Sequence, residues 1–193
     1  MLNRLMSVGF LISCMALPCS NTSASDTGLS LISAPDATPY THVIDTRDLQ
    51  DCETSSLPRG RCLPVDNFVD PTGKVISFHA LRWLLGTVGL SGAENVLVIG
   101  DKADTVRTVG ALLYLAGQKH VAVLEAPFTA ALNAPGGAGR SLSREVIFTA
   151  PMRDVYLLTQ LQDNSASQTN LARFALALSH GDRDARITFG LDQ

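Results

Sequence analysis

The chain has 193 residues, of which 46% are hydrophobic and 17% are charged, and its formal net charge is −3. This composition supplies a packed core and excludes a disordered or fibrous chain. No basic run is present, which argues against the clustered positive surface of a nucleic-acid-binding protein. After residue 24 no stretch approaches the roughly 18 uninterrupted apolar residues of a membrane span, so we predict no transmembrane segment in the mature chain.

The first 24 residues have the three-part pattern of a secretory signal peptide. Arg4 supplies positive charge, residues 5–17 are mainly apolar, and Thr22-Ser23-Ala24 places small residues before a cleavage site. We therefore expect a periplasmic or secreted protein. Two alternatives stay open. Leu11-Ile12-Ser13-Cys14 matches a lipoprotein processing box, which would anchor the chain through Cys14, and the segment could also be a buried N-terminal helix.

Export decides how Cys52 and Cys62, the two cysteines after the leader, are interpreted. In an oxidising compartment such a pair is expected to form a disulfide, although a redox role for it stays open. The Cys-x9-Cys spacing fits no zinc motif and the four histidines are scattered, so we predict no metal site. The glycine-rich residues 136–139 follow no predicted strand, and we predict no nucleotide or other cofactor.

Short apolar runs alternate with helical patterns, which predicts parallel strands joined by right-handed crossovers. The predicted strands are residues 29–33, 41–45, 95–99 and 120–124. The predicted helices are residues 78–85, 106–116 and, as a short turn, 128–132. The expected helix-capping residues are Ser77, Gly86, Asp104 or Thr105, and Gly117.

Two further regions lack a strand pattern. Residues 46–73 are polar and irregular, and they hold both cysteines, while residues 135–139 predict a turn or a mobile loop. Trp83 lies at the margin of the apolar stripe of helix 78–85, where core packing is the default expectation and an exposed contact site the alternative.

The pattern changes again from residue 151. Residues 155–161 and 171–178 predict two short amphipathic helices, and residues 187–189 predict an edge strand or a tail. We expect residues 27–150 to form one domain and residues 151–193 to form a short helical C-terminal extension of it.

Several of these segments, taken in order, resemble a rhodanese domain. Val43-Ile44-Asp45-Thr46-Arg47 is similar to the family's first core strand with its Asp-x-Arg ending. Residues 57–64 resemble its Ile-Pro-Gly-Ala…Pro segment, with Arg59 where a glycine is usual. Residues 95–99 correspond to the strand that enters the active-site loop, and residues 112–125 resemble the run that follows. The resemblance covers about residues 29–135.

This resemblance implies an α/β fold with a small parallel sheet and helices on both faces. Val146-Ile147-Phe148-Thr149, which precedes a predicted helix, extends the likeness to the inactive N-terminal half of tandem rhodaneses. A rhodanese sulfurtransferase begins its active-site loop with a cysteine whose thiolate takes up sulfane sulfur, while inward-pointing N–H groups stabilise the charge.

The chain departs from the family at that loop. The aligned position is Gly100 or Asp101, and no cysteine lies between residues 63 and 193. Counted from Asp101, the sequence has the Cys-x5-Arg length of phosphatases of the same fold, with the cysteine missing. The residues equivalent to the active-site loop are Gly100, Asp101, Lys102, Ala103, Asp104, Thr105 and Arg107.

Three interpretations of this loop stay open: a solvated turn, a small-anion site that uses Lys102 and Arg107, and a carboxylate nucleophile at Asp101. We predict an exported rhodanese-like binding or accessory module without catalytic residues, whose partner is another envelope protein. The alternative is a periplasmic sulfurtransferase of the thiosulfate:acceptor type, or a related enzyme, with an unrecognised nucleophile.

Overall fold

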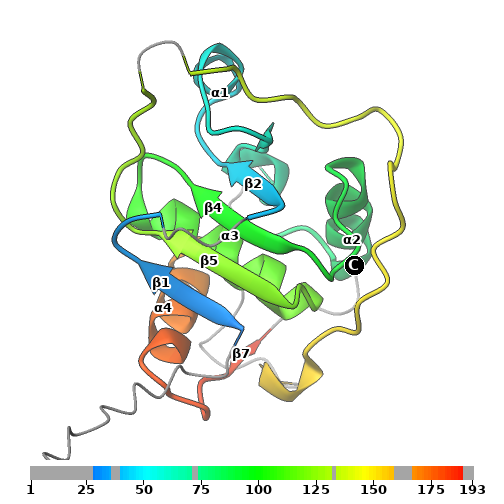
Figure 1. The fold of residues 1–193 in the computed structure, drawn as a ribbon. Coiled ribbons are helices and arrows are strands. Elements are labelled where there is room, and N and C mark those ends of the chain that lie inside the picture. Colours follow the sequence, from blue (N-terminus) through cyan, green and yellow to red (C-terminus); the bar gives the residue numbers. More distant parts are fainter. Residues whose placement is uncertain (1–27, 36–39, 71–73, 132–133, 159–166, 189–193) are drawn as a thin grey trace, which may run out of the picture.

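The computed structural model describes residues 28–35, 40–70, 74–131, 134–158 and 167–188. The expected leader lies outside these residues, so its cleavage and the Cys14 alternative stay predictions. Five parallel strands form the central sheet in the order β1-β5-β4-β2-β3 (Figure 1). They are β1 (Leu29–Ile32), β2 (His42–Asp45), β3 (Gly60–Cys62), β4 (Asn95–Ile99) and β5 (His120–Leu124).

Helices lie on both faces of this sheet. The helices are α1 (Leu49–Thr54), α2 (Phe78–Thr87), α3 (Ala103–Ala116) and α4 (Gln168–Ser179), with 3-10 turns at Val65–Asn67 and Asp154–Tyr156. Helices α2, α3 and α4 share the face that carries Ile44. The register Ile44↔Arg61 and Asp45↔Cys62 directs Cys62 to the opposite face, and its disulfide with Cys52 holds α1 there. The arrangement is the predicted α/β class and is consistent with a rhodanese-like fold.

The alternation of side chains along the strands produces two separate apolar clusters. The larger packs Ile44, Val98 and Val123 against α2, α3 and α4. The smaller lies on the other face and consists of Val43, Leu97, Ile99, Ala122 and Leu124. Because both faces of β4 and β5 are buried, these strands are apolar without interruption, as the sequence indicated.

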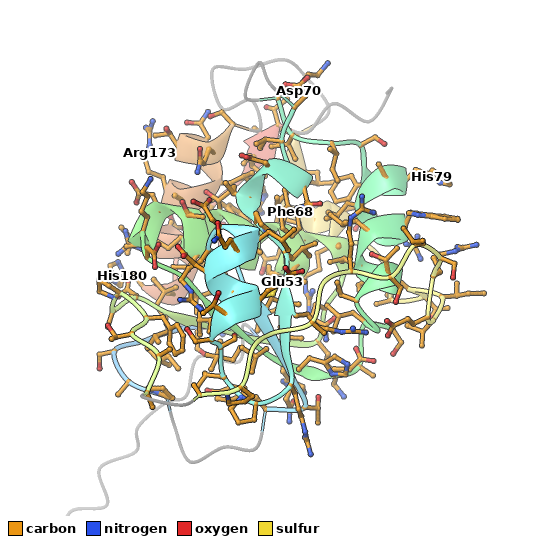
Figure 2. The ribbon with its side chains drawn as sticks, turned by 90° about the horizontal axis from the view of Figure 1, so that it is seen from above. Glu53, Phe68, Asp70, His79, Arg173 and His180 are labelled. Carbon is orange, nitrogen blue, oxygen red and sulfur yellow. A yellow bond between two sulfur atoms is a disulfide. The ribbon has the colours of Figure 1, made fainter. Side chains whose placement is uncertain are left out.

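The ends of the predicted helices agree with the structure at some positions and differ at others. Ser77 caps α2, with its hydroxyl accepting a hydrogen bond from Ala80 N at 3.2 Å, and Gly117 ends α3 with φ 114°. Gly86 does not end α2, which continues through Thr87. Figure 2 shows His79 of α2 and Arg173 of α4 pointing outward on opposite sides of the molecule.

Two local predictions are wrong. The segment after β2 contains α1 and β3 rather than irregular chain, because one buried residue, Cys52, anchors an otherwise polar helix that has no apolar stripe. Residues 128–131 are not helical. Instead, Phe128 N donates to Gly100 O at 2.9 Å, so a contact between distant parts of the chain holds this segment against the turn after β4.

Trp83 is also placed differently from the core position that we expected. Its side chain is 44% exposed, and the Arg144 guanidinium lies 4.3 Å from the centre of its ring. The apolar stripe of α2 is supplied by Leu81, Leu84 and Leu85, which are buried without it. Trp83 therefore takes the alternative position, as an exposed contact residue.

The C-terminal region joins the main core. Helix α4 packs against α3, and Leu171 and Phe174 belong to the larger cluster. The helix predicted over residues 155–161 is wrong for its described part, where Leu157–Leu158 forms strand β6 and pairs in parallel with β7 (Ile187–Thr188). Residues 159–166 and 189 lie outside the described residues. Leu157 and Leu158 are both only half-buried, so they do not form the buried apolar face that an amphipathic helix would have.

The expected disulfide between Cys52 and Cys62 is present, and glycine covers it closely. Both sulfur-bearing side chains are buried, and Gly137 N donates to Cys52 O at 2.8 Å. A Cβ at Gly137 would lie 2.6 and 2.7 Å from the two sulfur atoms, closer than real contacts allow. Residues 135–139 therefore pack against the disulfide and β3. This close approach requires a glycine at position 137.

We predict that the double variant Cys52→Ala/Cys62→Ala loses about 2–3 kcal/mol of unfolding free energy, because the short cross-linked loop gains freedom in the unfolded chain. Urea unfolding followed by circular dichroism measures this loss. The reduced native protein is the control and should lose a similar amount. A loss below about 0.5 kcal/mol, the range of neutral surface changes, would contradict a stabilising role for the bridge.

Candidate functional site

The candidate site lies where the direction of the chain connections reverses. From β2 the chain continues to β3 on one side, and from β4 it continues to β5 on the other. In open parallel sheets, ligands bind in the crevice outside the carboxyl ends of the strands at such a point. Here the ends of β2 and β4 are held together because Thr46 donates from its backbone N (2.9 Å) and its Oγ1 (3.0 Å) to Ile99 O.

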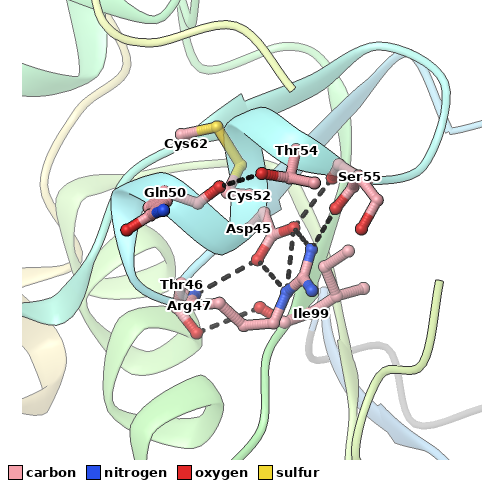
Figure 3. A network of polar contacts seen from close by, with 10 residues as sticks. Asp45, Thr46, Arg47, Gln50, Cys52, Thr54, Ser55, Cys62 and Ile99 are labelled. Atoms are coloured by element: carbon pink, nitrogen blue, oxygen red, sulfur yellow. Dashed lines mark hydrogen bonds and ion pairs between the residues drawn. A yellow bond between two sulfur atoms is a disulfide. The ribbon is translucent and has the colours of Figure 1, made fainter. Parts of the chain in front are cut away.

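A buried carboxylate with its arginine lies at the carboxyl end of β2 (Figure 3). Asp45 is inaccessible to solvent, and it accepts hydrogen bonds from Arg47 N (3.1 Å), Arg47 Nε (3.0 Å), Arg47 Nη2 (2.7 Å) and Ser56 Oγ (2.8 Å). Arg47 Nη2 also donates to Ser55 O. The Asp-x-Arg pattern that was found in the sequence thus joins the end of β2 to the chain that follows α1.

Arg47 is enclosed on its other side. Its side chain is 8% exposed, and its guanidinium lies 4.8 Å from the centre of the Phe128 ring. The hydrogen bond with Asp45 and the negative charges of Asp45 and Asp101 raise the pKa of Arg47 above its ordinary value. Arg47 is therefore a permanent cation whose charge is already balanced within the protein.

The segment from Gly100 to Arg107 does not form one loop. Only Gly100, Asp101 and Lys102 connect β4 to α3, whereas Ala103, Asp104, Thr105 and Arg107 belong to the helix. The sequence predicted Asp104 or Thr105 as the N-cap of α3, and this prediction is wrong. The N-cap is Lys102, and its side chain makes no capping hydrogen bond.

Gly100 explains how so short a connection fits. A Cβ on it would lie 2.2 Å from Thr46 Oγ1, so a larger residue would separate the ends of β2 and β4. Asp101 and Lys102 are exposed, and they follow directly. The structure therefore has a tight turn where the resemblance implied a longer loop around an anion.

Arg107 lies among carboxylates. Its Nε donates to Glu125 Oε1 at 2.8 Å, its Nη2 also contacts Glu125, and its Nη1 lies 3.3 Å from Asp104 Oδ1. Glu125 directly follows β5, a position that the sequence analysis did not single out. Its place as the first polar residue after a buried strand could have marked it, but its contact with α3 could not be foreseen.

The charges around the turn nearly cancel. Three carboxylates, at Asp101, Asp104 and Glu125, stand against the cations Lys102 and Arg107. In the described part of the chain, no group of three or more His, Cys, Asp or Glu side chains is placed to hold a metal ion. Likewise, none of the described helices is long and apolar enough to cross a bilayer.

Arg59 accounts for one departure from the family pattern. Its φ is 66°, in the left-handed region that favours glycine, and no other described residue except glycines has a positive φ. The glycine that is usual in the resembling segment suits this conformation. The turn before β3 therefore keeps its shape although the residue differs.

A cavity of about 660 Å³ lies beside the crevice, at the carboxyl ends of β1 and β5. Its walls come from the segments that follow β1, α1 and β5, and Phe128, which contacts Arg47, is one of them. No charged side chain is among the described residues that line it.

Comparisons with known proteins give two structural matches of low similarity. No protein-family model and no curated protein matches the sequence. One matching solved structure, a variant of EanB in complex with ergothioneine, has 14% identity and a TM-score of 0.46 over 69% of this chain and 38% of that one. Another, a probable thiosulfate sulfurtransferase, has 21% identity and a TM-score of 0.42 over 66% of this chain and 54% of that one.

The chain thus spans about half or less of the length of these two proteins. Their activities are not carried over to this chain by such likeness. The rhodanese-like fold rests instead on the parallel register and strand order seen here.

We predict that Asp45→Ala costs about 3–5 kcal/mol of unfolding free energy, because it leaves the buried Arg47 guanidinium without its counter-charge. Asp101→Ala is the matched control at an exposed carboxylate, and it should change stability by less than about 0.5 kcal/mol. The double variant Asp45→Ala/Arg47→Met should recover part of the loss. Urea unfolding measures the free energy of unfolding of the native protein and the three variants. Equal stability of Asp45→Ala and Asp101→Ala would contradict a stabilising role for the buried pair of Asp45 and Arg47.

Proposed function

We propose that this protein is an exported, non-catalytic rhodanese-like binding or accessory module. One observation carries the proposal: no thiol is available where sulfur transfer would need it. Asp101 stands at the end of β4, and Cys52 and Cys62, the two cysteines beyond residue 24, are joined in a buried disulfide. A persulfide requires a thiolate, which a carboxylate cannot replace as a carrier of sulfane sulfur.

The shape and charge of the turn support the same proposal. Three residues connect β4 to α3, and Arg107 is held by Glu125 and Asp104. A small anion at this turn remains part of the proposal, supported by exposed Lys102 and by the uncapped start of α3. The three carboxylates near it oppose such binding, so we expect it to be weak.

An exposed apolar surface supports a protein partner, which we propose to be another envelope protein. The Arg144 guanidinium stacks on the ring of Trp83, a residue of α2, and Leu142 and Ile147 in the same segment as Arg144 are exposed. Ser141 N donates to Thr87 O at 3.0 Å, which holds this segment against the end of α2. Exposed apolar patches with tryptophan and arginine are typical of protein interfaces.

The proposal predicts that the mature protein forms no persulfide with thiosulfate and transfers no sulfur to cyanide. Intact-mass spectrometry and a thiocyanate assay measure the two reactions. In Asp101→Cys we expect a thiol that iodoacetamide labels but no turnover, because the turn is too short to surround the substrate anion. Ser143→Cys, at an exposed position far along the chain, is the control for unspecific thiol reactions.

One result would overturn the proposal. Turnover by the native protein that disappears in Asp101→Ala would establish the alternative, a sulfurtransferase or related enzyme with an unrecognised nucleophile. Turnover gained only by Asp101→Cys would agree with the missing thiol as the cause of inactivity, but it would show that the turn still forms an anion cradle and that the argument about its length is wrong.

The export part of the proposal predicts that the protein isolated from its native cell envelope begins at Ser25, because cleavage follows the small residues at positions 22–24. N-terminal mass spectrometry measures this. A lipid-modified start at Cys14 would support the lipoprotein alternative, and a chain that still begins at Met1 would reject export by either route.

A further inference from the structure

We propose that the cavity beside the crevice binds a small, uncharged and largely apolar molecule. This inference goes beyond the proposed function, whose ligands are a protein partner and a weakly bound anion at the turn after β4, and it does not rest on it. The cavity is distinct from the turn at Gly100 to Lys102, since none of these three residues lines it. Its volume of about 660 Å³ lies in the range of sites that enclose small organic ligands.

The described walls of the cavity are mainly apolar. Four of the 14 described lining residues are prolines, at positions 35, 58, 127 and 135, and the ring of each fixes its own φ. Leu57, Leu124 and Phe128 add large apolar surfaces. All three also belong to or pack against the smaller apolar cluster, so the floor of the cavity is the second face of the sheet.

The charge of the ligand follows from what the walls lack. Every described lining residue is Ser, Thr, Ala, Pro, Leu or Phe, so the described walls offer no counter-charge to an anion or a cation. A charged ligand would lose its hydration without compensation, whereas a neutral one would not.

The polar groups on the wall suit a few directed hydrogen bonds. The hydroxyls of Ser33 and Thr129 line the cavity and are exposed, and neither has a hydrogen bond to another described residue. Sites for small molecules combine apolar walls with a small number of such groups, which set the orientation of the ligand.

The cavity is tied to the crevice by two of its walls. Ser56 donates to Asp45 Oδ2 at 2.8 Å, and Phe128 both stacks on Arg47 and donates its backbone N–H to Gly100 O at 2.9 Å. The walls are therefore held in place before a ligand arrives, which lowers the entropy lost on binding.

The test uses N-phenyl-1-naphthylamine, a neutral probe that fluoresces in apolar surroundings, added to the mature disulfide-bonded protein. We expect saturable binding to native protein. Ala126→Trp and Ala34→Trp place a large ring on the segments after β5 and β1 that line the cavity. Each should weaken binding by about tenfold or more, because the ring takes up space that the probe needs. Ala80→Trp, at an exposed position on α2, is the matched control and should leave binding unchanged.

A second probe tests the predicted charge. The anionic 1-anilinonaphthalene-8-sulfonate has a similar ring system, and we expect it to bind about tenfold more weakly or worse, because its sulfonate finds no cation on the wall. Thermal melts show whether each variant is folded, and only folded variants are compared. If one tryptophan variant unfolds, the other decides.

Three results would overturn the inference: no saturable binding to the native protein, binding that survives in a folded cavity-filling variant, or tighter binding of the anionic probe. Failure here is distinguishable from failure of the proposed function. Persulfide formation from thiosulfate reports only on the turn after β4, and probe binding reports only on the cavity.

Discussion

The buried carboxylate of Asp45 is the interaction on which the site depends. A charge removed from water is tolerated only where hydrogen bonds and a counter-charge replace its hydration, and here Arg47 and Ser56 supply both. In meeting that need, the two residues bring the end of β2 against the chain after α1. Phe128, stacked on Arg47, extends the same contact to the chain after β5. One buried charge therefore helps to hold the end of β2, the chain after α1 and the chain after β5 together.

The crevice keeps the position of a ligand site while its chemistry differs from that of a sulfurtransferase. Sulfur transfer needs a nucleophile that can be oxidised to a persulfide and a set of N–H groups that surround an anion. The turn after β4 has an aspartate and three residues of length, and Arg107, at the start of α3, is paired with two carboxylates. These features support our proposal that the site binds without covalent chemistry.

Local patterns were sufficient wherever one element carried the whole signal. The apolar runs of β4 and β5, the Ser77 cap and the Gly117 C-cap depend on neighbours in sequence, and all were predicted. Helix α1 and strand β3 were missed because each is short and polar, and they are stabilised by the Cys52–Cys62 bridge and by the strand beside them. Trp83 was misplaced because a margin position on a helix is settled only by what packs next to it.

The sequence by itself determined the parallel α/β class, the cysteine pair and the absence of a cysteine from residues 63–193, because strand periodicity and residue identity are local properties. Only the tertiary structure decided that Arg107 is bound to Glu125, 18 residues away, and that the turn before α3 has three residues. It also decided that loops after three separate elements line one cavity, whose described walls carry no charged side chain. These features arise where segments that are distant in sequence come into contact at the carboxyl edge of the sheet. Which segments come into contact depends on the order and register of the strands, and these are properties of the whole fold.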